Sequence, residues 1–293
     1  MGDLTGWTFD EYRRSLGENA PATVKGKLSA VKQLVGYLER IEAVSDGLED
    51  RVPVPTISAE DSRCEIKLAA KDAGKLIQKF RNSMAIYATV EHALLEVLWF
   101  TGARLSGVRA LDLSDYNSEI GVLRFVNRPD EGTRLKNGDD GERPVAIPET
   151  VTQVLDDYIK RERFDRRDRF GRASLFSARQ ARPSTSSFRA YTYLGTQPCI
   201  FQSCPHGRDR NRCDYRFRNA ASKCPSSRSP HQIRTGSITW QLNCGLSIED
   251  VADRVNATPT VIRRHYDVAT VDEKMRERRQ NFIDNLSLAE VDE

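Results

Sequence analysis

Five side chains whose types suit chemistry on a phosphate lie at widely separated positions in this sequence. Arg104 and Arg234 carry guanidinium groups, each of which can bind two phosphate oxygens. His231 and Lys136 can accept or donate a proton, and the phenol of Tyr266 can attack phosphorus once a base or nearby cations favour the phenolate. These residue types predict the transfer of a phosphoryl group to a tyrosine, provided that the fold brings them together.

The sequence around His231 carries the signals of a helix start. Ser229 is a favourable N-cap, Pro230 suits the first helical position, and Gln232 completes a capping box. His231 and Arg234 are then neighbours in the first turn, where free amides and the helix dipole favour an anion. The alternative is a capped helix whose polar side chains only face solvent.

The elements that must position the other residues are expected to be mainly helical. Gly102 is placed to end one helix, which puts Arg104 on the turn that follows. Asn137-Gly138 is a strong hairpin signal, so Lys136 is expected at the start of a tight β-turn. Helical patterns cover residues 9–41 in two segments, 69–80, 85–100 and 151–158, and short strands are expected at 122–126 and 143–147.

These motifs, in this order, resemble the tyrosine recombinases, the phage-integrase family, over nearly the full length of the chain. Residues 101–106, which include Arg104, are similar to the first arginine box of that family. Lys136 matches its β-hairpin lysine, its His-x-x-Arg box begins at His231, and Tyr266 matches its nucleophile. The resemblance implies a fold that is mainly α with a small antiparallel β-sheet, in the two-domain architecture of the tyrosine recombinases.

The expected domains follow from this resemblance together with the composition. Residues 1–52 are expected to form a helical, SAM-like core-binding domain that binds DNA. Residues 53–64 begin with prolines and have no helical period, so they are interpreted as a linker. Residues 65–293 are expected to form an α+β catalytic domain with a cysteine-rich insert near 199–224.

The resemblance also implies a reaction, the site-specific breaking and rejoining of DNA strands. Arg104 and Arg234 would clamp the scissile phosphate, and Tyr266 would attack it to leave a 3′-phosphotyrosyl link. Lys136 would protonate the departing 5′ oxygen, and His231 would act as base or proton relay. No cofactor is required for this catalysis, because the covalent link conserves the energy of the phosphodiester bond.

The sequence departs from the family pattern at two places. Gly107 stands three positions after Arg104, where the family usually has an acidic residue. The family also has a histidine or tryptophan shortly before its tyrosine, and here the candidates are Asn256, which could donate a hydrogen bond to a phosphate oxygen, and His265, which is next to Tyr266. Asn256 is therefore included among the predicted catalytic residues.

Four of the six cysteines fall in one polar, loop-like window: Cys199, Cys204, Cys213 and Cys224. Thiolates are good zinc ligands and four suffice for a closed structural site, but the spacing includes no Cys-x-x-Cys pair. Structural zinc is the prediction, and free thiols or occasional disulfides are the alternative. Cysteine-bearing inserts are familiar in integrase-like proteins of archaea, so the chain resembles an archaeal-type integrase.

Two other functions remain open at the level of sequence. Residues 245–264 also resemble a helix-turn-helix, which would make the protein a transcriptional regulator that uses Arg263 and Arg264 on DNA. A recombinase fold that binds DNA without cutting it is the second alternative, because of Gly107 and the missing histidine. A zinc-dependent nuclease is disfavoured, since a four-cysteine site leaves no open coordination position.

Composition limits the location and the partners. The net charge is +3, from 45 basic and 42 acidic residues, which by itself does not indicate nucleic-acid binding. No apolar run approaches the roughly 20 residues of a membrane span, and no secretory signal is visible, so a cytoplasmic, nucleoid-associated protein is expected. Double-stranded DNA is the expected partner. A homo-tetramer on DNA is also expected, through a terminal helix at residues 271–288.

Overall fold

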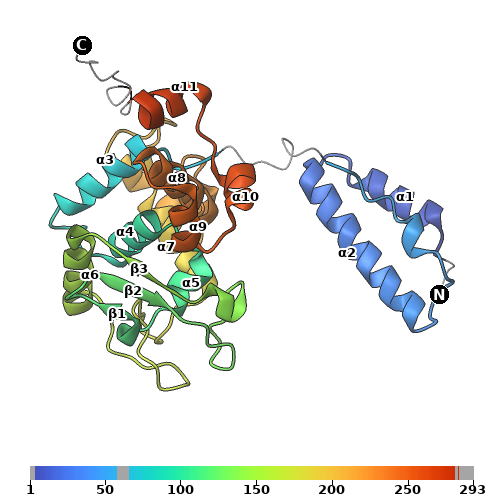
Figure 1. Cartoon of the computed structure of the whole chain (residues 1–293), viewed down its shortest axis with the longest axis horizontal. Helices are drawn as coiled ribbons and strands as arrows, with labels where there is room; N and C mark the ends of the chain where they lie inside the picture. The colour runs from blue at the N-terminus through green and yellow to red at the C-terminus, as the bar shows by residue number, and fades with distance from the viewer. Residues whose placement is uncertain (1–3, 58–65, 281–282, 284–293) are drawn as a thin grey trace, which may run out of the picture. The chain divides into compact units, whose positions relative to one another are not determined.

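The computed structural model describes residues 4–57, 66–280 and 283 (Figure 1). The chain divides into two compact units, residues 1–64 and 65–293. Of the expected linker, residues 53–57 form neither helix nor strand, and the rest lies outside the described residues. No helix in the described ranges is long and apolar enough to cross a membrane.

The N-terminal unit is a pair of helices with a short 3-10 turn. Helix α2 begins with proline at its first position, and its Leu28 and Val35 are buried. They pack with Phe9 of α1, whereas Leu34 of the same helix is 57% exposed. The elements are α1 (Gly6–Ser15), α2 (Pro21–Arg40) and the 3-10 turn Glu49–Arg51.

The C-terminal unit is built around helix α4, which is apolar on most sides and packs against five other helices. Its one buried carboxylate, Glu96, receives two hydrogen bonds from Arg81 at 2.7 and 2.8 Å and lies 3.1 Å from the ring of His92. The surrounding helices are α3 (Ala70–Arg81), α5 (Leu105–Ala110), α6 (Glu149–Arg161), α7 (Thr185–Gly195) and α8 (Pro230–Asn243), with α4 itself at Val90–Thr101.

A small antiparallel sheet lies beside these helices, in the order β1-β2-β3 (Figure 1). Leu123 of β2 faces Val145 of β3 in the register, and both side chains are buried in the core. The strands are β1 (Tyr116–Asn117), β2 (Val122–Phe125) and β3 (Arg143–Ala146). The expected fold class, mainly α with a small antiparallel sheet, is confirmed, although β1 was not predicted from the sequence.

One local prediction was wrong. The helix expected from residue 85 begins only at Val90, because Thr89 caps it and Ala88 has a positive φ of 55°. The tight turn expected at Lys136 is present, closed by a hydrogen bond from Gly138 N to Leu135 O. A 3-10 helix, which was not predicted, follows this turn before β3 begins.

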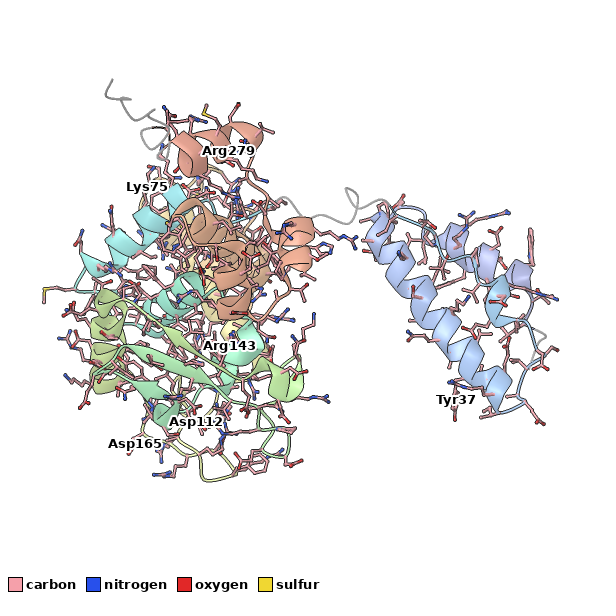
Figure 2. The ribbon with its side chains drawn as sticks, in the orientation of Figure 1. Tyr37, Lys75, Asp112, Arg143, Asp165 and Arg279 are labelled. Atoms are coloured by element: carbon pink, nitrogen blue, oxygen red, sulfur yellow. The ribbon has the colours of Figure 1, made fainter. Side chains whose placement is uncertain are left out.

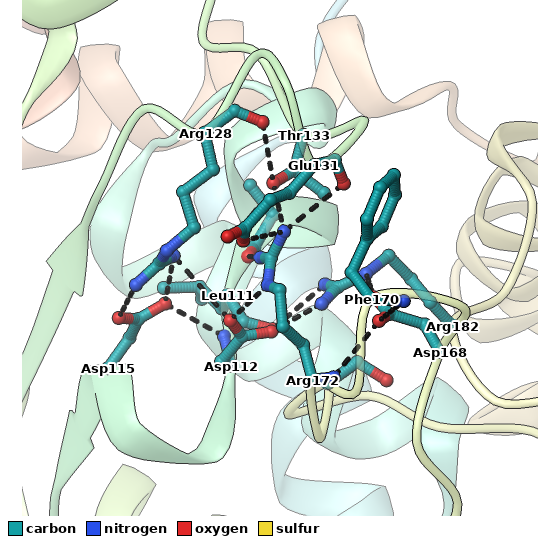
Figure 3. Close-up of polar contacts among 12 residues, drawn as sticks. Leu111, Asp112, Asp115, Arg128, Glu131, Thr133, Asp168, Phe170, Arg172 and Arg182 are labelled. Atoms are coloured by element: carbon teal, nitrogen blue, oxygen red, sulfur yellow. Dashed lines mark hydrogen bonds and ion pairs between the residues drawn. The ribbon is translucent and has the colours of Figure 1, made fainter.

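The long loops after β2 and α6 are fastened to the end of α5 by buried ion pairs (Figure 3). Asp112 accepts hydrogen bonds from Arg172 and Arg182. Asp115 binds both terminal nitrogens of Arg128, at 2.9 and 2.6 Å. Both carboxylates are only 5% exposed. Removing Arg128, for example, would leave the charge of Asp115 buried without its ion-pair partner.

The C-terminal part of the chain is a series of short helices. The described segment after residue 270 is α11 followed by a π-helical stretch; the rest of the terminal helix expected at 271–288 falls largely outside the described residues. The elements are α9 (Ile248–Val255), α10 (Pro259–Val261), the π-helix Ile262–Tyr266, α11 (Val271–Glu273) and the π-helix Lys274–Arg279. Short 3-10 helices also occur at Leu113–Asp115, Gly138–Gly141, Pro198–Ile200, Arg210–Arg212, Asp214–Arg216 and Ala221–Lys223.

The packing of α8 gives a test of the fold at Gly236. A Cβ atom at this position would lie 2.0 Å from the carbonyl oxygen of Leu68, whose amide also donates to Gln232 O. We expect Gly236→Ala to lower the free energy of unfolding by about 3 kcal/mol, because backbone has to move. Gly74→Ala in α3, where no atom lies within 4 Å, is the control and should stabilise by about 0.5–1 kcal/mol. Urea unfolding of both variants measures this, and equal midpoints would contradict the close approach.

Candidate active site

Helix α8 begins as its sequence predicts. The hydroxyl of Ser229 accepts a hydrogen bond from Gln232 N at 3.3 Å, and the Gln232 side chain accepts one from Ser229 N at 2.8 Å. Pro230 occupies the first turn. His231 remains accessible to solvent, whereas Arg234, one turn further, is only 2% exposed. The alternative of a helix start whose polar residues only face solvent therefore does not hold for Arg234.

The C-terminal end of α9 provides acceptors for three arginines. Asn256 ends this helix in the left-handed conformation, with φ of 51°, which asparagine tolerates better than most residues. The carbonyl of Val255 accepts from Arg234 Nη1 at 2.9 Å, and the carbonyl of Asn256 accepts from Arg104 Nη1 at 2.7 Å. The carbonyl of Arg254, the preceding residue, accepts a hydrogen bond from Arg143 Nε at 2.7 Å. Helix α9 thus holds the two predicted phosphate-binding arginines side by side.

Arg234 is the buried cation of the site. Its Nη1 donates to Gly102 O at 2.7 Å as well as to α9, but its Nε and Nη2 are buried and have no hydrogen-bond partner in the described part of the chain. Burial lowers the pKa of Arg234 to about 10, with Arg104 adding to the effect and Tyr266 opposing it. Buried donors without acceptors are costly, so these two nitrogens would be stabilised by an anion.

Tyr266 lies directly beside these groups. The guanidinium carbon of Arg234 is 4.9 Å from the centre of the Tyr266 ring, and the ring of His231 is 5.5 Å from it. Tyr266 ends the short π-helix, and its carbonyl accepts a hydrogen bond from Thr239 of α8 at 2.8 Å. The tyrosine, which is 7% exposed, is therefore fixed against α8 at both its ring and its backbone.

Lys136 and Asn256 line a small pocket together with Arg104. The other residues that line it are Ser106, Gly107, Leu135, Gly141 and Arg143. The Asn256 side chain accepts from Asn137 Nδ2 at 2.5 Å and donates to Asp140 O at 2.8 Å. In the structure Asn256 thus tethers the loop that carries Lys136, and its role as a donor to phosphate remains a prediction.

The charged groups with the largest effect on His231 are cations. Partial burial lowers the pKa of His231, and Arg234, Arg104, His265 and Lys136 lower it further. A histidine that stays neutral at physiological pH can accept a proton, and the surrounding cations favour an anion.

The segment after Tyr266 is held by ion pairs. Asp267 binds Arg278 through two hydrogen bonds at 3.1 and 2.8 Å and lies 2.9 Å from the ammonium of Lys274. Burial raises the pKa of Asp267, but the hydrogen bonds from these two cations outweigh it and bring the pKa below its usual value. The carboxylate next to the tyrosine is thereby directed to the C-terminal segment and does not neutralise the cationic site.

The four predicted cysteine ligands line a single small cavity. Cys199, Cys204, Cys213 and Cys224 contribute to it, together with His206. None of the four forms a disulfide. Within the described ranges, however, no three His, Cys, Asp or Glu side chains lie as close together as around a bound metal ion. One neighbour, Arg210, donates a hydrogen bond to Cys199 Sγ at 3.1 Å.

Sequence reasoning missed Arg143, which the structure places with the predicted residues. Arg143 lies on β3 (Figure 2). Its side chain donates to the end of α9 and lines the pocket of Lys136 and Arg104. The strand pattern gave no signal of this, because alternation indicates only that Arg143 faces away from Pro144. The predicted residues themselves are brought together: Arg104, Lys136, His231, Arg234, Asn256 and Tyr266.

Comparisons with known proteins bear on the fold. No model of a protein family matches the sequence, and no curated protein is similar to it by sequence comparison. Among solved structures, the chain is similar to XerA recombinase, with a TM-score of 0.52, 15% identity, and coverage of 97% of this chain and 84% of that one. The Tn1549 transposon integrase in complex with a circular intermediate DNA gives a TM-score of 0.62, 15% identity, and coverage of 97% and 86%. XerH site-specific recombinase bound to a palindromic difH substrate gives a TM-score of 0.62 and 15% identity. The match covers 97% of this chain and 72% of that one.

The electrostatics of His231 can be tested by nuclear magnetic resonance. We expect its ring to titrate below the ordinary value of 6.5, and Arg104→Gln to move the midpoint upward because one of the cations is removed. Since the unfolded chain takes up the proton first, lowering the pH through 6.5 should also destabilise the folded chain. His231→Asn assigns the signal, and Arg163→Gln is the control, because Arg163 donates to the carbonyl of Ser174 outside the site. A midpoint at or above 6.5 in the unmodified protein would refute the cationic environment.

Proposed function

Because the chain has the fold of the tyrosine recombinases, we propose that it breaks and rejoins DNA strands at specific sites through a 3′-phosphotyrosyl intermediate. One observation carries the proposal. The buried guanidinium of Arg234 has two nitrogens without hydrogen-bond partners in the described residues, and it lies against the ring of Tyr266. A phosphodiester bound there would satisfy these donors and place phosphorus next to the phenol.

The proposed reaction uses the site residues as follows. Arg234 and Arg104 bind the non-bridging oxygens of the scissile phosphate and stabilise the charge that builds on them. The Tyr266 oxygen forms a bond to phosphorus while its proton passes to the neutral ring of His231. The bond from phosphorus to the 5′ oxygen breaks, and Lys136 supplies the proton that converts this oxygen to a hydroxyl. Attack by the 5′-hydroxyl of a partner strand reverses these transfers and releases the tyrosine.

Since the phosphotyrosyl bond conserves the energy of the phosphodiester, the proposed reaction requires no cofactor. The N-terminal unit, with its pair of helices, is proposed to be the core-binding domain that contacts DNA. The partner is double-stranded DNA, on which the chain would assemble as a homo-tetramer. Val271 and Met275, which are 78% and 46% exposed, offer apolar side chains for such an assembly near the C-terminus. DNA association would place the protein with the nucleoid.

The alternatives fit the geometry less well. A helix-turn-helix regulator would use Arg263 and Arg264, which are indeed exposed, but it assigns no purpose to the buried donors of Arg234. A recombinase fold without cleavage is opposed by the contact between Tyr266 and His231, a nucleophile beside a base. Both alternatives predict binding of DNA without a covalent product, so one measurement separates them from the proposed reaction.

A covalent trap tests the function. Nicked duplexes with candidate sites should give a denaturation-resistant protein–DNA adduct, and Tyr266→Phe should abolish it, because phenylalanine lacks the hydroxyl that forms the phosphotyrosyl bond. DNA binding should remain within about twofold, since the ring and its contacts are kept.

Tyr193→Phe is the matched control and should leave the adduct yield unchanged, because this partly buried tyrosine of α7 is not among the residues that surround the site. DNA binding without any adduct across a broad panel of sites would support a regulator or a cleavage-dead protein. An adduct that persists in Tyr266→Phe would assign the nucleophile to another residue.

We further propose that the cysteine cluster binds a structural zinc ion. The four thiols and the cavity that they share match, in type and number, a closed tetrahedral site. Arg210, which already contacts Cys199, would favour the thiolate form that zinc requires. Zinc would join loop segments that contain only short 3-10 helices, and it would do so immediately before the helix that carries His231.

Metal analysis of the purified chain tests this proposal. We expect about one zinc per chain in the unmodified protein and a loss of most of it in Cys213→Ser. Cys244→Ser should retain the metal, because Cys244 is exposed and lies outside the cluster. A zinc-free protein in which all four thiols react with a thiol reagent would refute the site, and four unreactive, reducible cysteines would indicate disulfides instead.

A further inference from the structure

The two halves of the candidate site belong to different parts of the C-terminal unit. Arg104 and Arg234 are held by the end of α9, whereas Lys136 lies in the loop between β2 and β3. The proposed reaction needs the proton donor and the phosphate-binding groups at fixed separation, because a misplacement of about 1 Å can cost 10²-fold in rate. Some contact must therefore set the distance between the loop and the helix.

Arg143 connects these two parts directly. Its Nε donates to the carbonyl of Arg254 at 2.7 Å, and its Nη1 donates to the carbonyl of Gly141 at 2.8 Å, where the loop of Lys136 ends. In return, Arg254 Nη2 donates to the carbonyl of Ala146 in β3 at 3.2 Å. The fork of one guanidinium thus links the last turn of α9 to the end of the loop, which a single ammonium could not do in the same geometry.

The plane of the Arg143 guanidinium is fixed by Phe125. Its carbon lies 4.4 Å from the centre of this ring, which is itself buried in the core. The ring packs closely over Gly107, where a Cβ atom would lie 3.2 Å from it. The absence of a side chain at position 107 therefore leaves room for the ring that supports Arg143.

Arg143 also stays close to the other cations. Burial lowers the pKa of Arg143 to about 10, and Arg234 and Arg104 contribute to this effect. Three guanidiniums that repel one another remain together only if other contacts hold them. The three consecutive carbonyls at the end of α9 supply these contacts, helped by the negative end of the helix dipole.

We propose that Arg143 is a positioning residue of the site: it ties the C-terminal turn of α9 to the loop of Lys136 and so sets the placement of Arg104, Arg234 and Lys136 around the phosphate. It acts through backbone carbonyls. Its effect on the rate rests on the proposed function, but its effect on the positions of the cations does not.

The test compares Arg143→Gln and Arg143→Lys with the unmodified full-length chain. Both variants lose the forked contact, so both should slow formation of the covalent adduct by at least 10-fold, and Lys, despite its charge, should not rescue it. Both should also shift the titration midpoint of His231 upward, because Lys136, which lowers its pKa, is no longer held in place once the contact of Arg143 with the end of its loop is lost. Arg143→Lys keeps a positive charge at position 143, so a shift in this variant reports movement of the other cations and not the loss of charge.

Arg163→Gln is the matched control. Arg163 is also buried and also donates from Nε to a backbone carbonyl, that of Ser174, but it lies outside the site. It should lower stability without moving the titration of His231 or the adduct rate. A full rescue by Arg143→Lys would overturn the proposal in favour of a role for charge alone. An unchanged histidine midpoint in both Arg143 variants would overturn it in favour of a purely structural role.

The two proposals can fail separately. If the unmodified chain forms no adduct, the proposed function fails, and the histidine titration still decides whether Arg143 positions the cations. If the unmodified chain forms the adduct and neither Arg143 variant changes the rate or the titration, only the role of Arg143 is refuted. Should Arg143→Gln not fold, Arg143→Lys, which keeps the aliphatic stem over Phe125, gives the same decision.

Discussion

The arrangement of the site depends on three successive backbone carbonyls at the C-terminal end of α9. Those of Arg254, Val255 and Asn256 accept hydrogen bonds from Arg143, Arg234 and Arg104, in that order. The last carbonyls of a helix have no partner within the helix and carry partial negative charge. The left-handed conformation of Asn256 ends α9 at this point and leaves these carbonyls for the arginines. A short helix end thereby gathers guanidiniums that come from three distant segments of the chain.

This arrangement explains how cations can be concentrated in a nearly buried place. Arg234 keeps two buried nitrogens without acceptors in the described part of the chain, and the charged groups with the largest effect on His231 are cations. The neighbouring Asp267 is occupied by Arg278 and Lys274. In the network of Asp112 and Asp115, by contrast, the arginines are paired with carboxylates (Figure 3). The charge of those arginines is neutralised within the protein, whereas the charge of the site is available to an anionic ligand.

Much of the fold could be predicted from the sequence, because helix caps and hydrophobic periodicity depend on residues that are close together in the chain. The caps at Ser229, Ser247 and Thr258 lie where their residue types predict, and Gly102 ends α4 in the left-handed conformation. Such signals act over three or four residues and need no tertiary contact. Residue patterns predicted most of α4 and the strands β2 and β3 for the same reason. The turn expected from Asn137-Gly138 is also present, but such a local signal does not predict the 3-10 helix that follows it.

By itself the sequence determined the residue types of the candidate site, their order and the helices that carry them, because helix caps and hydrophobic periods are local. Only the tertiary structure decided that Arg234 is buried with free donors, that Asn256 tethers the loop of Lys136, and that Arg143 belongs with them. Each of these facts depends on a contact between residues about a hundred or more positions apart, or on the burial of one side chain by several elements. Spacing in the chain carries no information about such contacts, since the free energy that forms them comes from packing of the whole unit.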